Sequence, residues 1–221
     1  MTDGELPVVV FDLDGTITRS DTYVPFLLYA LYKQPLKILR LPVLAIDVLR
    51  YKVGSQSNSW LKTRFLDAIL AGQKRAVIEN WAKSFSLYIF DKGLHLDAIS
   101  TINSHQERGH DLVLLSASLD IYVELLGEYL GFKHIICTRT NWENNVLGSE
   151  LNGGNCYGKS KVQRLNQWLS HRTDKFVLIA YADHKSDFPI LKIAQRGIVI
   201  NPDKMLRKKA VRNQLEIAEW K

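Results

Sequence analysis

The sequence has few cysteines and no long uncharged hydrophobic run. Its two cysteines, Cys137 and Cys156, cannot supply the four ligands of a thiolate zinc site or the disulfide framework of a small secreted domain. We therefore expect a reducing, cytoplasmic location. In the apolar segment that follows the first strand, the longest uncharged run is residues 22–32, well short of the ~18–20 residues of a membrane-spanning helix. The acidic start Met-Thr-Asp-Gly-Glu predicts no signal peptide.

The composition is that of an ordinary globular protein. Of the 221 residues, 46% are hydrophobic and 24% charged, which excludes a disordered tail, a collagen-like repeat and a disulfide-rich miniprotein. A chain of this length is expected to form one domain, or one domain with a large insertion. No feature of the sequence predicts an oligomeric state.

Positive charge is concentrated in two places. The net charge is +6, and lysine and arginine cluster in residues 23–52 and 203–221. Such clusters attract phosphate groups of nucleic acid, anionic lipid or phosphorylated metabolites, but they also occur as solvated helix faces. Neither cluster is accompanied by an aromatic platform or a nucleic-acid motif, so we expect no nucleic-acid partner.

The pattern of hydrophobic residues predicts an α/β fold with an insertion. Val8-Val9-Val10-Phe11 is a buried strand, and residues 21–90 are mostly helical, with Asp21 as a helix N-cap. The rest alternates: helix 94–108, strand 112–115, helix 119–130, strand 134–137, a hairpin or loop over 141–155, helix 159–170, strand 176–180, helix 187–195 and strand 198–200. This order predicts a doubly wound parallel (Rossmann-like) sheet, with a core of residues 1–20 and 91–221 and an inserted helical segment of residues 21–90.

Polar side chains follow three of the predicted strands. Asp12 and Asp14 come directly after the first strand, Ser116 follows the second, and Asp183 follows strand 176–180. Ligands bind at the carboxyl ends of such strands. Carboxylates this close repel each other unless a cation accompanies them, and oxygen ligands suit Mg²⁺. A carboxylate can also attack phosphorus to form an aspartyl-phosphate.

Four strings resemble the ordered motifs of the haloacid dehalogenase-like (HAD) phosphatases. They are Phe11-Asp12-Leu13-Asp14-Gly15-Thr16, Leu114-Leu115-Ser116-Ala117-Ser118, Cys156-Tyr157-Gly158-Lys159-Ser160-Lys161, and Ala180-Tyr181-Ala182-Asp183-His184-Lys185-Ser186-Asp187. The resemblance spans residues 8–202 and implies a phosphomonoester hydrolase whose core carries a helical cap. Two positions depart from the family pattern, since Ala182 stands for the usual glycine and His184 for the usual serine.

The resemblance also implies a role for each site residue. Asp12 would be the nucleophile and Asp14 the general acid and base. Mg²⁺ would be held by Asp12, Asp14 and Asp183, with Asp187 in support. Ser116 and Lys161 would bind the phosphoryl oxygens; the spacing from Cys156 selects Lys161, with Lys159 as the alternative. His184 would contact substrate or be only a polar loop residue.

A helical insertion after the first motif resembles the C1 cap of the phosphoserine phosphatase-like subgroup. Within that subgroup, shorter strings such as Phe26-Leu27-Leu28-Tyr29 and Gln34-Pro35-Leu36 resemble the phosphatidylglycerophosphatase C type. This implies a lipid phosphate as substrate, with a small soluble ester such as phosphoserine as the alternative. The mixture of apolar and basic residues over 23–52 then predicts peripheral contact with an anionic membrane. The alternative is that these apolar side chains form the core of the cap.

One string points to a different class of protein. Residues 153–160, Gly-Gly-Asn-Cys-Tyr-Gly-Lys-Ser, match the phosphate-binding P-loop of nucleotide-binding proteins. A P-loop follows a buried strand, whereas residues 141–152 are polar. A P-loop protein is therefore a remote alternative.

Overall fold

The computed structural model describes residues 6–221. Its strands are β1 (Val8–Phe11), β2 (Asp111–Leu119), β3 (His134–Glu143), β4 (Val146–Asn152), β5 (Leu178–Ala182), β6 (Arg196–Ile200) and β7 (Glu216–Ala218). The α-helices are α1 (Tyr23–Lys33), α2 (Leu41–Lys52), α3 (Asn58–Phe65), α4 (Arg75–Lys92), α5 (Leu96–Glu107), α6 (Asp120–Tyr129), α7 (Lys159–Leu169), α8 (Phe188–Ile193) and α9 (Lys204–Arg212). Shorter helical turns are η1 (Pro35–Arg40), η2 (Leu66–Leu70) and η3 (Lys185–Asp187).

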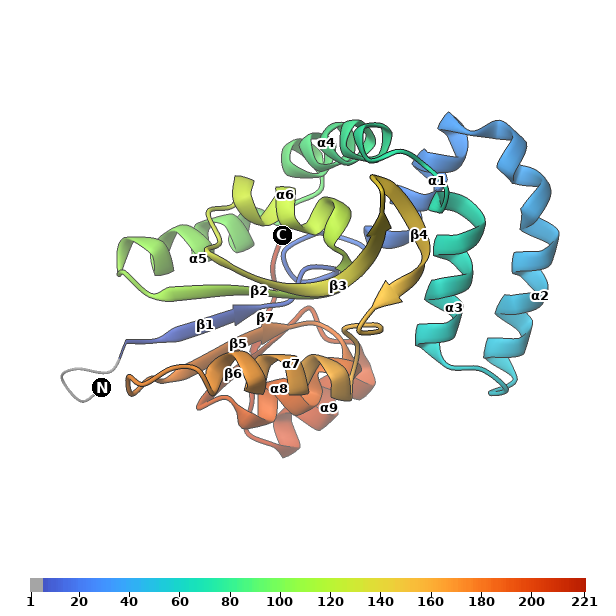
Figure 1. Ribbon diagram of the computed structural model, residues 1–221. Helices are drawn as coiled ribbons and strands as arrows, with labels where there is room; N and C mark the ends of the chain where they lie inside the picture. The colour runs from blue at the N-terminus through green and yellow to red at the C-terminus, as the bar shows by residue number, and fades with distance from the viewer. Residues whose placement is uncertain (1–5) are drawn as a thin grey trace.

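The strands form one sheet in the order β4-β3-β2-β1-β5-β6-β7. Every neighbouring pair is parallel except β3 and β4. Helices α5 and α6 cover one face, with α4 outside them, while α7, α8 and α9 cover the other (Figure 1). The predicted doubly wound α/β sheet is therefore confirmed, with an antiparallel hairpin at one edge.

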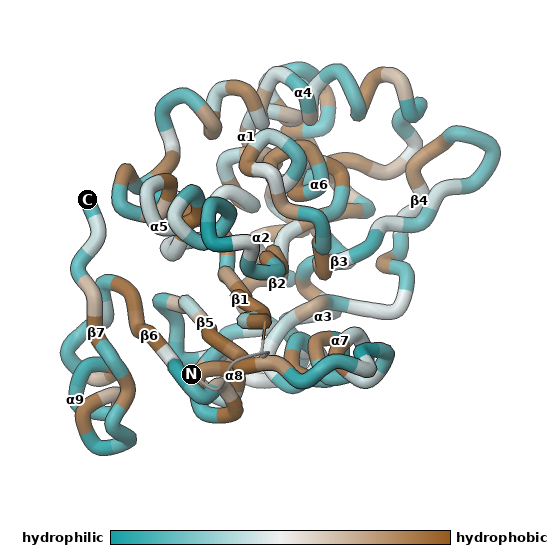
Figure 2. The backbone as a smooth tube through the Cα atoms, turned by 90° about the vertical axis from the view of Figure 1, so that its left-hand side faces the viewer, coloured by the Kyte–Doolittle hydropathy of each residue, from teal (hydrophilic) through white to brown (hydrophobic). Residues whose placement is uncertain are grey.

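The central strand is buried on both faces. Val9 and Phe11 pack into the hydrophobic cluster on one side of the sheet, and Val8 and Val10 into the cluster on the other. Figure 2 shows β1, β5 and β6 as strongly hydrophobic. An unbroken apolar run suits a parallel strand with helices on both faces, because neither set of side chains reaches solvent.

Five strands differ from the sequence prediction. Strand β3 continues to Glu143 rather than ending at residue 137, and β6 begins at Arg196 rather than at residue 198. Strand β2 continues past Leu115 to Leu119, although its register with β3 is irregular there. Strand β5 begins and ends two residues later than predicted. Strand β7 was not predicted, because three residues within a charged terminus carry no detectable alternation. The predicted hairpin is present and turns at Asn144 and Asn145, both with positive φ, as a tight hairpin turn requires.

Residues 21–90 leave the sheet after β1 and return to it through α4. Helices α2 and α3 lie side by side beyond one end of the sheet (Figure 1). Helix α4 packs on α6, where the rings of Phe85 and Tyr122 lie 5.3 Å apart. Thr22 occupies the N-cap position of α1, but Asp21 supplies the capping bond by accepting the Val24 N–H at 3.0 Å. Residues 6–221 contain no helix with the length and hydrophobicity of a membrane span.

Candidate active site

A cavity of about 700 Å³ lies where the ends of β1, β2 and β5 meet residues 21–90. Asp12 follows β1 and Asp183 follows β5, and the parallel pairing of these strands brings the two residues to the same edge. Lys161 and Asp187 reach the cavity from α7 and η3. The residues that the sequence singled out are thus brought together, with one exception. Ser116 is completely buried, and its neighbours Ala117 and Ser118 line the cavity in its place.

A buried lysine joins two of the carboxylates. Lys161 Nζ lies 2.7 Å from Asp12 Oδ1 and 2.9 Å from Asp187 Oδ1. Burial lowers the pKa of Lys161, but Asp12 and Asp187 more than offset this, so the amine stays charged. Burial raises the pKa of Asp12; Lys161 opposes the rise, and the charges of Asp187, Asp183 and Asp14 add to it. One lysine therefore does not neutralise the carboxylates gathered here.

Asp14 is held from both sides. Its Oδ1 accepts the N–H and the hydroxyl of Thr22, at 2.7 and 2.5 Å, and its Oδ2 accepts the hydroxyl of Ser118 at 2.6 Å. Burial raises the pKa of Asp14 and Asp21 raises it further, while the bonds from Ser118 and Thr22 oppose the rise. A carboxyl with a raised pKa is suited to carry a proton to and from a reacting group.

The irregular part of β2 places three neighbouring residues in three different roles. Ser116 Oγ accepts the N–H of Ser118 at 3.0 Å, and Ser118 itself reaches Asp14. Between them, the carbonyl of Ala117 accepts hydrogen bonds from Thr138 Oγ1 and from Lys62 Nζ. A bulged strand re-aims its side chains, so residues that would alternate between two faces can serve one site.

The loop after β1 approaches Asp183 very closely. Thr16 Oγ1 donates to Asp183 Oδ1 at 3.1 Å. Gly15 has φ +80°, and a Cβ at this position would lie 2.2 Å from Asp183 Oδ2. Only glycine permits this backbone conformation and this approach together.

The residues present fit a magnesium ion. Within residues 6–221 there is no cluster of three or more acidic, histidine or cysteine side chains of the kind that encloses a metal. Mg²⁺ does not require three such side chains, because it keeps several waters and usually takes one or two carboxylates together with a substrate phosphate. Asp12 and Asp183 supply two carboxylates at a place where the carboxylates outnumber the cations. Burial raises the pKa of both. A cation at this position would offset that surplus.

The two departures from the family pattern leave the carboxylates in place. His184 lines the cavity, but its Nδ1 accepts the N–H of Ser186 at 3.2 Å and thereby caps η3. Ala182 is the last residue of β5 and is buried. Of the two candidate lysines, Lys159 is exposed and Lys161 is 2% exposed and paired with Asp12.

The P-loop string does not have the setting that such a loop requires. It follows β4, an antiparallel strand at the edge of the sheet, rather than a buried parallel strand. Within the string Lys159 is exposed, so its amine is not held over a phosphate-binding loop.

The structure adds a residue that sequence analysis missed. Lys62, on α3, lines the cavity, and its Nζ donates to the Ala117 carbonyl at 2.5 Å and lies 4.5 Å from the ring centroid of Tyr23. Burial lowers the pKa of Lys62 to about 8. No motif in the sequence marks Lys62, because its place in the cavity depends on its contact with Ala117, a residue remote in the chain.

The two sides of the cavity differ in chemistry. The side formed by the ends of the strands carries the aspartates and Lys161. The opposite side, from residues 21–90, is largely apolar, with the polar residues Asp21, Asn58 and Lys62 among the side chains of Tyr23, Val24, Leu27, Val48, Leu61 and Phe65. A ligand that fills this space has a charged end and a less polar end.

Comparison with known proteins places the chain in a family. The family model for haloacid dehalogenase-like hydrolases matches residues 9–192. Protein CicA of Caulobacter vibrioides is 32% identical over 85% of this chain and 82% of its own length. A histidinol-phosphatase of Neisseria meningitidis is 28% identical over 49% of this chain and 51% of its own length.

Solved structures share the fold. A Bordetella pertussis protein of unknown function superimposes with a TM-score of 0.83 and 22% identity, covering 96% of this chain and 98% of the other. A probable phosphoserine phosphatase of Vibrio cholerae gives a TM-score of 0.72 and 13% identity, covering 92% of this chain and 58% of the other. The family match and the phosphatase relatives identify the enzyme as a phosphomonoester phosphatase. The chain therefore belongs to the haloacid dehalogenase-like hydrolase family.

Proposed function

We propose that this phosphatase transfers the phosphoryl group first to Asp12 and then to water. The observation that carries the proposal is the meeting of Asp12, Asp14, Lys161 and Asp183 in one cavity. In the first step an Asp12 carboxylate oxygen bonds to phosphorus as the bond to the leaving oxygen breaks, and Asp14 protonates that oxygen. In the second step Asp14 takes a proton from water, whose oxygen displaces the Asp12 carboxylate and releases phosphate.

The other polar residues stabilise charge during these steps. Lys161 both orients Asp12 and faces the phosphoryl oxygens, and Asp187 holds Lys161 in place at 2.9 Å. Ser116 donates its hydroxyl to a phosphoryl oxygen; its Oγ accepts the Ser118 N–H, which leaves its own hydrogen free for this bond. Groups already in position where charge develops contribute strongly to the rate.

Magnesium would be held by the Asp12 carboxylate, the Asp14 main-chain carbonyl and the Asp183 carboxylate. When bound, the ion neutralises the repulsion between these carboxylates and the incoming phosphoryl group. Gly15 and Thr16 serve this site by keeping Asp183 close to the loop after β1.

The test of this proposal is Mg²⁺-dependent phosphate release by wild type and Asp12→Asn. We expect wild type to hydrolyse p-nitrophenyl phosphate and Asp12→Asn to lose activity while keeping its melting temperature within a few degrees. Asp174→Asn is the matched control, because Asp174 is an exposed aspartate whose side chain pairs with Arg172 on the surface. Activity in Asp12→Asn close to that of wild type would rule out the covalent route.

We also propose that residues 21–90 form a C1-type cap over the core and that the substrate is a lipid phosphate such as phosphatidylglycerophosphate. The apolar side of the cavity supports this, because it suits the less polar part of such a molecule. The apolar residues of 23–52 include both buried and exposed side chains. Phe26 and Leu27 are buried, whereas Tyr32 and Leu39 are 78% and 80% exposed.

The exposed apolar side chains of this segment support contact with an anionic membrane. They are Val24, Leu28, Tyr32, Leu36, Ile38, Leu39, Leu41, Val43, Ile46 and Leu49. Lys33, Arg40, Arg50 and Lys52 lie among them and are also exposed. A mixture of exposed apolar side chains and cations matches the surface of an anionic bilayer.

Flotation with phosphatidylglycerol-containing vesicles tests the membrane contact. Wild type should float with the vesicles, and the double variant Leu36→Ser/Leu39→Ser should float much less. Met205→Ser on α9 is the control, since Met205 is 82% exposed but lies outside the proposed surface. Absence of wild-type flotation would eliminate the membrane contact without affecting the proposed chemistry.

A small soluble phosphomonoester such as phosphoserine is the second candidate substrate. Lys62 favours it, because a buried amine in the cavity can pair with an anionic group on a small leaving group. The two candidates are separated by phosphate release from phosphatidylglycerophosphate in mixed micelles and from phosphoserine. A higher kcat/KM for the lipid supports the first candidate, and a higher value for phosphoserine supports the second.

A further inference from the structure

A second, smaller cavity adjoins the candidate active site. It has a volume of about 430 Å³ and is lined by residues 57–59, at the start of α3, and by residues 153–155, Tyr157 and Ser160, which lie between β4 and the first turn of α7. Asn58 and Tyr157 line both cavities. The second cavity, the polar groove, therefore continues the first, and it includes part of the string that matches a P-loop.

The polar groove begins close to the two lysines of the larger cavity. On α3, Asn58 precedes Lys62 by four residues, so the two side chains lie on the same face of the helix. On the other wall, Ser160 directly precedes Lys161, which holds Asp12. One helical turn rises only about 5.4 Å. A substrate whose phosphoryl group contacts Lys161 therefore has its leaving group within reach of the polar groove.

The lining of the polar groove differs from both sides of the larger cavity. Within the described residues 6–221, every residue that lines it is polar or glycine, and none carries a charge. Because no lysine or arginine lines it, the groove offers no partner for a carboxylate or a second phosphate, and because no aliphatic side chain lines it, the groove does not suit an acyl chain. Hydroxyl and amide groups can both donate and accept, which matches the hydroxyl groups of a polyol.

Four of the lining side chains have hydrogen-bonding groups left for a ligand. Asn58 uses its carbonyl oxygen to accept from Asn155 Nδ2 at 2.6 Å, which leaves its own amide hydrogens. Ser59 Oγ accepts the Asn155 N–H at 3.3 Å, which leaves its hydroxyl hydrogen. In the part of the chain that the structure describes, the hydroxyls of Tyr157 and Ser160 make no hydrogen bond within the protein.

Both walls of the polar groove are held in place. Arg164 donates to the carbonyls of Gly153 and Gly154 at 2.7 and 2.8 Å, and to the carbonyl of Cys137 at 2.8 Å. These bonds tie the loop before α7 to β3. On the other wall, the bonds between Asn155 and residues 58–59 tie the start of α3 to the same loop.

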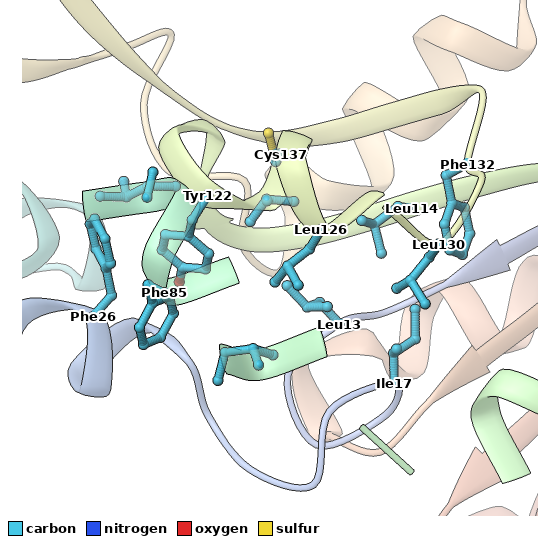
Figure 3. Packing of buried hydrophobic residues seen from close by; sticks show 14 of the residues in the cluster. Leu13, Ile17, Phe26, Phe85, Leu114, Tyr122, Leu126, Leu130, Phe132 and Cys137 are labelled. Atoms are coloured by element: carbon cyan, nitrogen blue, oxygen red, sulfur yellow. The ribbon is translucent and has the colours of Figure 1, made fainter. Parts of the chain in front are cut away.

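The inserted residues are also fixed on the core at a distance from the groove. The ring of Tyr122, on α6, packs against Phe26 of α1 and Phe85 of α4 at centroid distances of 4.8 and 5.3 Å (Figure 3). Its hydroxyl lies 3.1 Å from Thr22 Oγ1. A site whose walls are positioned in advance loses less free energy in ordering when a ligand enters.

We propose that the polar groove binds hydroxyl groups of the leaving group, so that the enzyme prefers phosphate esters of polyols, such as glycerol or a sugar, to esters of simple alcohols. The inference rests on the proposed function, because it concerns the alcohol that the phosphatase releases. A soluble polyol phosphate and a lipid with a phosphorylated glycerol head group present the same hydroxyl chemistry to this groove. The leaving group of phosphoserine does not, since it carries a carboxylate and an ammonium group instead.

Matched pairs of esters test the inference. Glycerol 1-phosphate and n-propyl phosphate share a carbon chain and differ only in hydroxyls, as do phosphatidylglycerophosphate and its 1,3-propanediol analogue in mixed micelles. The measured quantity is the ratio of kcat/KM for the hydroxylated ester to kcat/KM for its partner, taken on the pair that wild type hydrolyses faster. The intrinsic reactivities of the two esters differ, but this difference is the same for every variant and cancels when ratios are compared.

Two variants of the groove should lower this ratio. Tyr157→Phe/Ser160→Ala removes two hydroxyls without breaking a hydrogen bond of the protein, and we expect the ratio to fall by about 5-fold or more, since one hydrogen bond contributes about 2- to 10-fold. Ser160→Leu, which places an aliphatic side chain in the groove, should lower the ratio at least as far. Tyr88→Phe/Ser100→Ala is the control, because both residues are exposed and lie outside the groove, and it should keep the wild-type ratio.

The outcomes separate this inference from the proposed function. A wild-type ratio in Tyr157→Phe/Ser160→Ala would overturn the assignment of the groove while leaving the phosphatase chemistry intact. So would a higher kcat/KM for phosphoserine than for either hydroxylated ester, or hydrolysis of p-nitrophenyl phosphate without hydrolysis of those esters. Failure of wild type to hydrolyse any phosphate ester in Mg²⁺, or full activity in Asp12→Asn, would overturn the proposed function itself.

Discussion

Lys161 Nζ lies 2.7 Å from Asp12 Oδ1, and both side chains are almost completely buried. Lys161 belongs to α7 and Asp12 follows β1, so the contact joins distant parts of the chain. The lysine also pairs with Asp187 on η3. The same amine therefore orients the candidate nucleophile and links three separate elements of the core.

Removal of that amine should destabilise the protein as well as inactivate it. Lys161→Met leaves Asp12 and Asp187 buried without a partner, and breaking a buried ion pair costs about 3–5 kcal/mol. We expect a loss of about 3 kcal/mol in the free energy of unfolding, measured by urea denaturation at neutral pH. Lys159→Met is the control, because Lys159 is exposed. Equal stability of the two variants would contradict the structural role of Lys161.

Gly15→Ala should weaken the metal site. The added Cβ would lie 2.2 Å from Asp183 Oδ2, so either the loop or the carboxylate must move. We expect the Mg²⁺ concentration for half-maximal activity to rise by about 10-fold or more, as for other changes that displace a ligand. Gly54→Ala is a close control: Gly54 has a similar φ of +77° but no atom within 4 Å of the added Cβ. An unchanged Mg²⁺ requirement in Gly15→Ala would argue against Asp183 as a ligand.

Substrate binding should weaken as the pH rises above 8. Burial lowers the pKa of Lys62 to about 8, so its amine is charged below that pH and neutral above it. If the charged amine contacts an anionic substrate, KM should rise on the alkaline side of pH 8. Lys62→Arg, which stays charged, should delay that rise to higher pH, and Lys62→Met should raise KM at all pH values. A wild-type KM that is constant from pH 7 to 9 would exclude this contact.

Acid should destabilise the fold partly through His105. Its ring lies between His110 Nδ1 at 2.7 Å and the Tyr181 hydroxyl at 2.9 Å, and burial lowers its pKa to about 4 from an ordinary value of 6.5. Between these values the unfolded chain binds a proton that the folded protein does not, so stability is full above pH 6.5 and falls as the pH drops toward 4.

The contribution of His105 to that loss can be measured. We expect His105→Gln to lose about 2 kcal/mol less than wild type between pH 7 and pH 4, by urea denaturation at each pH. His171→Gln is the control, because His171 is exposed. If His105→Gln and wild type lose stability in parallel, another group is responsible.

The sequence alone was sufficient to predict the sheet and the residues at its edge. Val8–Phe11 is apolar without alternation, so it had to be a strand covered on both faces. Because neighbouring parallel strands end at the same edge of the sheet, residues that follow them, such as Asp12 and Asp183, are predicted to lie close together. The boundaries of helices and strands were predicted less accurately. Strand β2, for example, continues through a bulge that no local sequence pattern reveals.

Only the tertiary structure decided which neighbours complete the site. The spacing from Cys156 selects Lys161 with Lys159 as the alternative, and the packing of α7 buries Lys161. Lys62 and Tyr122 carry no motif, because their contacts depend on how α3 and α6 lie against residues remote in the chain. The exposure of Leu36 and Leu39 could not be predicted from the sequence either. A hydrophobic pattern shows which side chains are apolar but not which of them the fold leaves exposed to solvent.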